Sequence, residues 1–492
     1  MRGKYLIIFI KFNVYGILSE VMKTTKKQDN GITEKDIVGK IIVPSDVYYG
    51  VETERALNNY RVSGIHIQRE FIQVYALVKK CAAISNMNVG KLDKKIGAAI
   101  VAACDEIIDG KFLDQFKIDI FQAGAGTNIN MNVNEVVANR ALEIIGSEKG
   151  NFSLIHPNDH VNMSQSTNDT VPSVIRISTF IEIKKLLIPA LRMLEKELYD
   201  KAEDFASIIK IGRTHLQDAV PMSLGQEFSG YAETVSLLID NIENAAKYLL
   251  EIPIGGTAIG TGLNASEEYR QDIIKQINNE LKIFEIDEKF RLSKNRFRDT
   301  QNRIAEMILS DAINSFTIGL NKIINDLVIL VSGPRNGIHE LILKPAQPGS
   351  SIMPGKINPS YLEMQNMVLF QVQGTNYIIR KAVSSAQLEL NVYMPIIAYN
   401  LLFSIRILSN SIKIFSKNAI KELKVDVERI NKYIENNLSI VTSLTPYIGY
   451  DKASYIVMTA YKENKTIMQV CTELKILDPI KLKELLDPKS QI

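Results

Sequence analysis

Hydrophobic residues recur with helical spacing along most of the chain. Steps of three and four residues place side chains on one face of a helix. Between residues 299 and 331 the apolar positions follow such steps, at Leu309, Ile313, Phe316, Leu320, Ile323 and Leu327. The opposite face carries polar side chains such as Asp311, Lys322 and Asp326. A helix of this length with a 3.5-residue stripe is typical of a bundle, and we expect one here.

Similar patterns predict further long helices, over residues 173–206, 226–250, 360–386 and 395–415. Few segments resemble strands, and the best candidate is the run from Ile41 to Val43 near the start. The pattern therefore predicts an all-α protein built around a long helix bundle.

Five segments rich in small and polar residues separate the predicted helices: 124–134, 156–169, 212–225, 254–264 and 348–359. A bundle needs only short connectors, so five long polar loops are unexpected on structural grounds. Ordinary turn chemistry would explain any one of them. Because sites are often built from loops on a rigid scaffold, we expect the functional residues in this set.

Composition excludes some classes of protein. The 492 residues are 46% hydrophobic and 23% charged, which is typical of a soluble globular protein. The 58 basic and 55 acidic residues give a net charge of +3, too even for a dedicated nucleic-acid binder. A small anionic substrate needs only a local basic pocket, so it remains compatible with this balance.

The three cysteines, Cys81, Cys104 and Cys471, are far apart in the sequence. Their spacing fits neither a disulfide framework nor a zinc site, so we interpret them as small buried hydrophobic residues. A reducing cytoplasm is the compartment that suits them.

The N-terminus carries a short apolar run, from Tyr5 to Ile10, after Arg2 and Lys4. Lys11 interrupts this run, no small-residue cleavage site follows, and the run is too short to span a bilayer. We interpret residues 1–30 as a disordered or spurious extension, with Met22 as a candidate start. Residues 1–21 are then expected to be dispensable.

Three familiar site patterns can be rejected. The segment from Gly349 to Lys356 has five residues between its glycines and Ile357 where a phosphate loop needs Ser or Thr. The glycines of residues 255–262 lack the βαβ context of a dinucleotide site. His156 and His160 are four residues apart, but Pro157 breaks the helix that would align them on a metal ion.

The remaining polar loops suit a small anion. Hydroxyl, amide and imidazole donors occur at Ser166-Thr167-Asn168 and at Thr214-His215, and Lys356 and Asn358 add a cation and an amide. A dicarboxylate needs neutral donors for its oxygens and one or two cations. Ser350 follows Gly349 and lies near Lys356, an arrangement that could activate a serine as a base in a closed, dry site. From these residues alone, however, two serines beside a glycine are usually just an ordinary loop.

These residues resemble the aspartase/fumarase superfamily from about Asp36 to the C-terminus. Residues 349–359 read Gly-Ser-Ser-Ile-Met-Pro-Gly-Lys-Ile-Asn-Pro, which matches the superfamily's most specific motif. The Asp-Val-Tyr-Tyr-Gly of residues 46–50, the Gly-Thr of 126–127 with the Asn-Met-Asn of 130–132, and the Gly-Arg-Thr-His-Leu-Gln-Asp of 212–218 are similar to aspartases and class II fumarases. Argininosuccinate and adenylosuccinate lyases match less well.

The resemblance implies a three-domain, mostly helical fold and a homotetramer assembled around a 20-helix core, with each active site shared between subunits. The implied divisions are 31–166 for the N-terminal domain, 167–420 for the central bundle and 421–492 for a small C-terminal helical domain. No organic cofactor is expected, and no membrane or nucleic acid is an expected partner. Some relatives are activated by a divalent cation such as Mg²⁺, and no residue here indicates whether this chain is.

The resemblance also implies roles for individual residues. Ser350 is expected to be the base that removes a C3 proton, and Glu363 to orient His215. Thr214 and His215 are expected to bind one carboxylate, and Lys356 and Asn358 the other carboxylate or the enediolate-like intermediate. The expected lining of the substrate pocket is Thr127, Ser166, Thr167 and Asn168, the last three also near the leaving ammonium.

Four positions favour the aspartase branch over the fumarase branch: His160, Thr167, Val220 and Gln387. The implied reaction is the anti elimination of ammonia from L-aspartate to give fumarate. Two alternatives are a class II fumarate hydratase and a non-catalytic relative that retains the bundle. Several positions depart from the usual aspartase pattern: Ala123, Asn128, Ser384, Ser385, Ala386, Tyr393 and Met394. Asn128 replaces a usual Ser beside Thr127, and this places the fit of the substrate in question.

Overall fold

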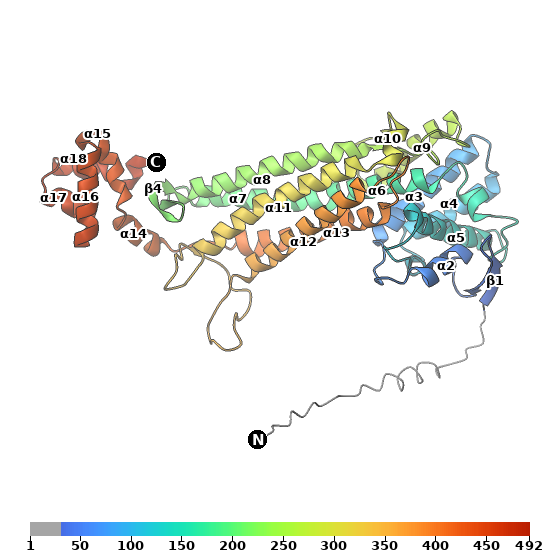
Figure 1. The fold of residues 1–492 in the computed structure, drawn as a ribbon, viewed down its shortest axis with the longest axis horizontal. Helices are drawn as coiled ribbons and strands as arrows, with labels where there is room; N and C mark the ends of the chain where they lie inside the picture. Colours follow the sequence, from blue (N-terminus) through green and yellow to red (C-terminus); the bar gives the residue numbers. More distant parts are fainter. Residues whose placement is uncertain (1–30) are drawn as a thin grey trace, which may run out of the picture.

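The computed structural model describes residues 31–492, and it is an elongated, almost entirely helical molecule (Figure 1). A cluster of helices from the first part of the chain lies at one end, the bundle forms the middle, and a small C-terminal helical group lies at the other end. The predictions for residues 1–30, including the dispensability of residues 1–21, lie outside the described residues.

The N-terminal end begins with a two-stranded antiparallel sheet of β1 (Gly31–Lys35) and β2 (Lys40–Pro44), which confirms the strand expected at Ile41 to Val43. The helices that follow are α2 (Val51–Asn59), α3 (Arg69–Asn88), α4 (Lys94–Ile108) and α5 (Thr127–Ile144). Helix α3 packs against α4 and against the later helix α9 (Glu267–Glu280), so distant parts of the chain meet at this end.

The bundle consists of six long helices: α6 (Thr167–Glu182), α7 (Ile188–Asp204), α8 (Leu224–Ala246), α11 (Ile304–Leu330), α12 (Ser360–Ser384) and α13 (Met394–Phe415). They confirm all five long helices expected from the periodicity, with α6 and α7 joined by the π-helical turn Ile183–Leu187. The six stripe residues of α11, Leu309 to Leu327, are each at most 1% exposed, which confirms that this face forms part of the core.

Two segments expected to be loops are regular structure. Residues 209–223 form the antiparallel hairpin of β3 (Ile209–Thr214) and β4 (Gln217–Ser223). Its tip is exposed, so the apolar–polar alternation that indicates a strand is weak there. Most of segment 124–134 belongs to α5, because its polar residues, such as Asn130 and Asn132, are buried and hydrogen bonded instead of facing solvent.

The C-terminal group packs around a second hydrophobic core that includes Leu444, Ile456 and Cys471. Its helices are α14 (Val427–Glu435), α15 (Thr445–Ile448), α16 (Tyr450–Glu463), α17 (Ile467–Glu473) and α18 (Pro479–Leu485). The remaining α-helix and strands are α10 (Arg296–Gln301), the parallel pair β5 (Glu251–Ile252) and β6 (Arg291–Leu292), and the antiparallel pair β7 (Leu341–Ile342) and β8 (Lys424–Val425). The exact division into three domains stays a prediction.

Two sequence-based interpretations concern buried groups. The three cysteines are all buried and free, as expected. The segment Met394–Ile420 is long and apolar enough to cross a membrane by length and composition. Two thirds of it is buried inside the protein, where α13 packs against α12, α7 and α6, so it is a core helix of the bundle.

Candidate functional site

A cavity of about 590 Å³ lies at the N-terminal end, where α5 and α6 begin. Three of the predicted pocket residues, Thr127, Ser166 and Thr167, line it. Amide and hydroxyl side chains also contribute, among them Asn130 and Thr257. The lining is therefore rich in neutral hydrogen-bonding groups, which suits a small polar ligand.

Both helices present their N-terminal ends to this cavity. Ser166 caps α6, accepting from the backbone N–H of Asn168, while the Asp169 carboxylate accepts from the backbone N–H of Ser166 at 2.9 Å. Thr127 is the first residue of α5. Because a helix N-terminus carries partial positive charge and unpaired N–H groups, two of them at one cavity favour an anion.

Asp169 and Asn168 hold the glycine-rich loop of residues 254–264 over α6. The buried Asp169 carboxylate accepts from the backbone N–H groups of Gly255 and Thr257, at 3.0 and 2.9 Å. Burial raises the pKa of Asp169 to about 6, although these N–H donors oppose the shift. The Asn168 amide donates to the Ala258 carbonyl at 2.8 Å. These bonds fix one wall of the cavity.

Thr214 and His215 lie at the tip of the β3–β4 hairpin. His215 and Leu216 form its two-residue turn, with φ of 53° and 60°, a geometry that side chains other than glycine adopt at a cost. Below the tip, Arg213 donates to the buried Glu340 carboxylate at 2.7 Å, and Lys210 pairs with its other oxygen at 2.9 Å. A buried ion cluster thus anchors an exposed hairpin that presents a threonine and a histidine.

Ser350 lies in the segment before α12, which projects from the bundle (Figure 1). Its hydroxyl oxygen accepts from the backbone N–H groups of Ile352 and Met353, at 3.2 and 2.9 Å. Backbone donors of this kind stabilise a negative charge on the oxygen they face. This local geometry suits a serine that acts as a base.

The base of this segment is closed by bonds between its two arms. The Gly349 N–H donates to the Lys356 carbonyl and the Asn358 amide donates to the Gly349 carbonyl, both at 2.8 Å. A Cβ at Gly349 would lie 2.7 Å from backbone atoms of Lys356 and Asn358, so the close approach requires glycine. The Lys356 side chain is exposed.

The predicted site residues form two groups at opposite ends of the bundle (Figure 1). His215 precedes the first residue of α8, whereas Asn168 contacts Ala258, which follows its last residue. A helix of 23 residues is about 35 Å long. Within residues 31–492 of one chain, Glu363 is exposed in the first turn of α12 and makes no hydrogen bond to His215.

Metal-binding geometry is not found in the part of the chain that the structure describes: no group of three or more His, Cys, Asp or Glu side chains is arranged to hold an ion. The Nδ1 atom of His156 accepts from the backbone N–H groups of Asn158 and Asp159. The Nδ1 atom of His160 accepts from the N–H of His156 at 2.8 Å. Both imidazoles therefore shape the turn Pro157–Val161 through these atoms.

Sequence reasoning missed a buried lysine beside the cavity. Lys79, on α3, has no exposed surface and donates hydrogen bonds to Asn130, Asn162 and Gln165. Burial lowers its pKa to about 7. Its neighbours on the same helix face, Ala76 and Ala83, are apolar, and this was the available signal, because a lysine on the inner face of a helix needs a polar partner.

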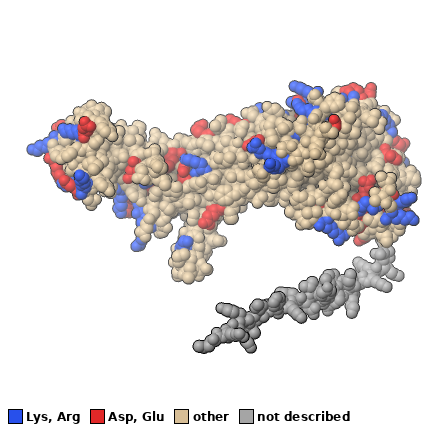
Figure 2. Space-filling view, in the orientation of Figure 1, with Lys and Arg blue, Asp and Glu red and all other residues tan. Residues whose placement is uncertain are grey.

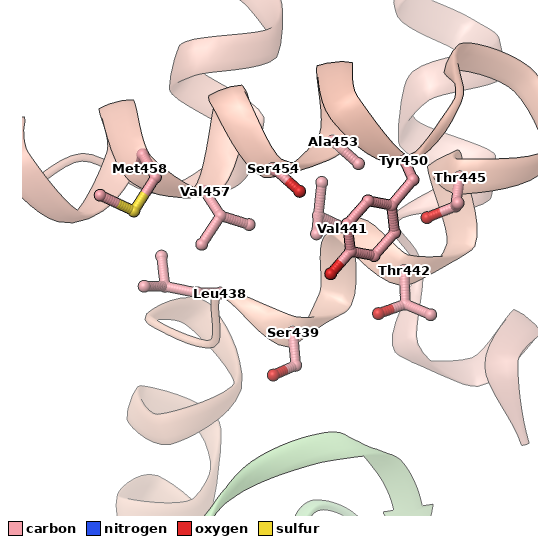
Figure 3. A pocket seen from close by; sticks show the side chains of 10 residues that line it. All are labelled: Leu438, Ser439, Val441, Thr442, Thr445, Tyr450, Ala453, Ser454, Val457 and Met458. Atoms are coloured by element: carbon pink, nitrogen blue, oxygen red, sulfur yellow. The ribbon is translucent and has the colours of Figure 1, made fainter.

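A second cavity, of about 490 Å³, lies in the C-terminal group (Figure 3). Val441, Val457 and Met458 are among its lining side chains, with hydroxyl groups such as those of Thr442 and Ser454. None of the predicted site residues lines it, and no charged side chain does. It therefore does not coincide with the residues that the sequence predicts for the site.

Comparison with known proteins gives consistent matches over almost the whole chain. Residues 39–374 match a protein family described as Lyase, and residues 440–490 match one described as Fumarase C C-terminus. An aspartate ammonia-lyase from Bacillus sp is 45% identical over 92% of this chain and 96% of its own. A class II fumarate hydratase from Neisseria meningitidis is 42% identical over 94% and 99%. The crystal structure of class II fumarase from Schistosoma mansoni superposes with a TM-score of 0.90, at 37% identity, over 93% of this chain and 98% of that one.

Proposed function

Because the chain belongs to the aspartase/fumarase family of lyases, we propose that it is an aspartate ammonia-lyase. It would catalyse the reversible anti elimination of ammonia from L-aspartate to give fumarate. The observation that carries this proposal is the cavity of about 590 Å³ bordered by two helix N-termini and by the hydroxyl groups of Thr127, Ser166 and Thr167. Helix N-termini and hydroxyl donors of this kind stabilise a small anion, and Lys356 would supply the cation that the lining itself lacks. Enzymes of this family need no organic cofactor.

The choice of L-aspartate over L-malate rests on four positions that follow the aspartase pattern: His160, Thr167, Val220 and Gln387. Among these, Thr167 alone lines the cavity. Identities of 45% and 42% to relatives with the two activities are too similar to decide between them. Thr167 is therefore the one of these four residues that would contact the substrate directly.

In the proposed mechanism Ser350 removes the C3 proton. The N–H groups of Ile352 and Met353 would stabilise its alkoxide, and the nearby Lys356 would stabilise the carboxylate on which charge develops. Asn358 would hold the segment closed and contact the same carboxylate.

The remaining residues would bind the rest of the substrate. Thr214 and His215 would bind the second carboxylate, with Glu363 orienting the imidazole of His215. Thr127, Ser166, Thr167 and Asn168 would surround the substrate from the cavity side. The ammonium would leave from the face opposite to the abstracted proton, as anti elimination requires.

These roles need more than one subunit, and we propose a homotetramer with a 20-helix core. Exposed apolar side chains lie along α8, α11 and α12: Leu237, Ile318, Met367, Phe370 and Tyr377. Figure 2 shows few charged side chains along the central bundle on the face it presents. Large exposed apolar patches of this kind are typical of interfaces. Antiparallel packing of such bundles would bring the hairpin and the Ser350 segment of other subunits to the cavity.

A class II fumarate hydratase is the second candidate, because relatives with that activity are 42% identical. Incubation of fumarate with an ammonium salt distinguishes the two. The proposed function predicts L-aspartate as the product, whereas accumulation of L-malate would support the hydratase. The buried free cysteines suit a soluble enzyme of the cytoplasm, and no nucleic acid or membrane is an expected partner.

A further inference from the structure

We propose that Lys79 and Asn130 are positioning residues that fix the hydroxyl group of Thr167 as a hydrogen-bond donor toward a carboxylate of the substrate. This inference rests on the proposed function, because it concerns the same cavity. It assigns roles to two buried residues that the proposed mechanism does not use.

The ammonium group of Lys79 has three N–H bonds and no acceptor. Its nitrogen lies 2.8 Å from the side-chain oxygen of Asn130, 2.8 Å from that of Asn162 and 3.0 Å from that of Gln165. All three partners are amides, so every proton of the ammonium is used and none points to a carboxylate. Each amide must therefore turn its oxygen toward Lys79.

The orientation of the Asn130 amide follows from this contact. Its oxygen also accepts from the Tyr75 hydroxyl at 2.8 Å, so two donors hold the same atom. The amide nitrogen must then point away from Lys79, and it lies 3.0 Å from the hydroxyl oxygen of Thr167. Because an amide N–H only donates, Thr167 accepts this bond.

A threonine hydroxyl that accepts from Asn130 still has its own proton to donate. No acceptor within residues 31–492 takes that proton, and Thr167 lines the cavity although only 8% of it is exposed. The free direction of this proton is therefore the cavity. A bound ligand that presents an oxygen acceptor completes the chain of bonds from Lys79.

The direction of these hydrogen bonds, from Lys79 to Thr167, determines which group of the substrate Thr167 can bind. A carboxylate oxygen only accepts hydrogen bonds, whereas the ammonium of L-aspartate only donates them. A proton presented by Thr167 matches a carboxylate oxygen. Thr167 would thus bind a carboxylate in preference to the leaving ammonium, which adds a carboxylate contact to the role expected for it from the sequence.

The decisive experiment combines Asn130→Asp with Thr167→Val in a double-mutant cycle. A carboxylate at position 130 keeps the shape and accepts from Lys79, but it cannot donate to Thr167. Thr167→Val removes the hydroxyl. Loss of one aligned donor lowers kcat/KM by about 100-fold, so each single variant is expected to lose about that factor. If the two substitutions remove the same hydrogen bond, kcat/KM of the double variant should lie within about threefold of that of either single variant.

Two further variants test whether the loss of activity in Asn130→Asp comes from the lost hydrogen bond to Thr167, from the added negative charge or from a failure to fold. Asn58→Asp adds the same charge at an exposed position of α2, where Arg61 already donates to Asn58 at 2.9 Å, and it should leave kcat/KM unchanged. Lys79→Met should cost about 100-fold in the wild-type background and little in the Thr167→Val background. Melting temperatures and tetramer size identify variants that fail to fold, and the Asn130→Asp cycle remains decisive if Lys79→Met does so.

Two results overturn the inference. One is an Asn130→Asp variant within about threefold of wild type, and the other is a double variant whose losses multiply to about 10⁴-fold. The rates are measured with L-aspartate and L-malate in parallel. A wild type that acts only on L-malate would contradict the proposed substrate, yet the cycle can then be measured with L-malate and still tests the inference.

Discussion

Asn168 and His215 lie at opposite ends of α8, although the proposed mechanism assigns both to one substrate. Asn168 donates to Ala258 beyond the last residue of this helix, and His215 lies in the hairpin before its first. About 35 Å of helix separates them, far more than the length of a four-carbon dicarboxylate. Under the proposed mechanism, a complete site would therefore require residues from different subunits.

This separation predicts complementation between inactive variants. Ser350→Ala and Thr167→Val each remove a different part of the site, so each tetramer alone is impaired. Co-expressed subunits that mix at random should contain some sites with both parts intact, and roughly a quarter of wild-type activity should return. Mixed tetramers can be isolated with two affinity tags. No recovery in tetramers that carry both tags would contradict the shared site.

The apolar surface of the bundle predicts that assembly is sensitive to charge. Phe370, on α12, is 56% exposed in the single chain, and Phe370→Glu would bury a carboxylate in the proposed core. We expect dissociation to smaller species and loss of activity, with helical content retained. Light scattering with size-exclusion chromatography measures the mass. Tyr461, on α16, is 74% exposed, and Tyr461→Glu should remain tetrameric. A tetrameric Phe370→Glu variant would exclude this face as an interface.

Ser350→Ala should abolish turnover because it removes the proposed base. General base catalysis contributes about 10²- to 10⁴-fold, so kcat should fall by at least two orders of magnitude. The Ser350 hydroxyl accepts from exposed backbone N–H groups of its own segment, so mass and melting temperature should match those of the wild type. Turnover within about tenfold of wild type would remove Ser350 from this role.

A buried ion cluster predicts acid sensitivity of the fold. Burial raises the pKa of Asp299, but hydrogen bonds from Arg298 and Arg176 outweigh this effect and hold the pKa well below its ordinary value. A depressed pKa stabilises the folded state above the unfolded pKa near 3.9, and this contribution is lost as pH falls below it. Asp299→Asn should cost roughly 3–5 kcal/mol at pH 7. Urea midpoints should converge with those of the wild type below about pH 4. A constant difference across pH would contradict the assignment.

The sequence predicted the bundle well, because burial of one helix face leaves a periodic trace. Leu309 and Leu327, at the ends of the α11 stripe, are both buried as expected. The β3–β4 hairpin was missed because its tip is exposed and the buried residues of β3, Lys210 to Gly212, are consecutive and include a lysine, so no apolar–polar alternation marks the strand. The helical start of α5 was missed because its asparagines are buried through hydrogen bonds, which depend on partners distant in the sequence.

The sequence identified candidate residues for the site, but it did not predict where they lie relative to one another in the fold. The motif around Ser350 identified a loop, and the helix capping by Ser166 explains a polar run before α6. That the two lie at opposite ends of the bundle depends on the packing of the whole chain. Lys79 was overlooked because a lysine in a helix usually faces solvent. Nothing in the structure explains Asn128, whose buried amide nitrogen has no partner within residues 31–492.

The central claim is that L-aspartate is the substrate, and initial rates of fumarate formation test it most directly. The absorbance of fumarate is followed with L-aspartate and with L-malate, over the same range of concentrations and enzyme. The proposed function predicts fumarate and an equal amount of ammonia from L-aspartate, with no measurable rate from L-malate. Fumarate formation from L-malate alone would contradict it.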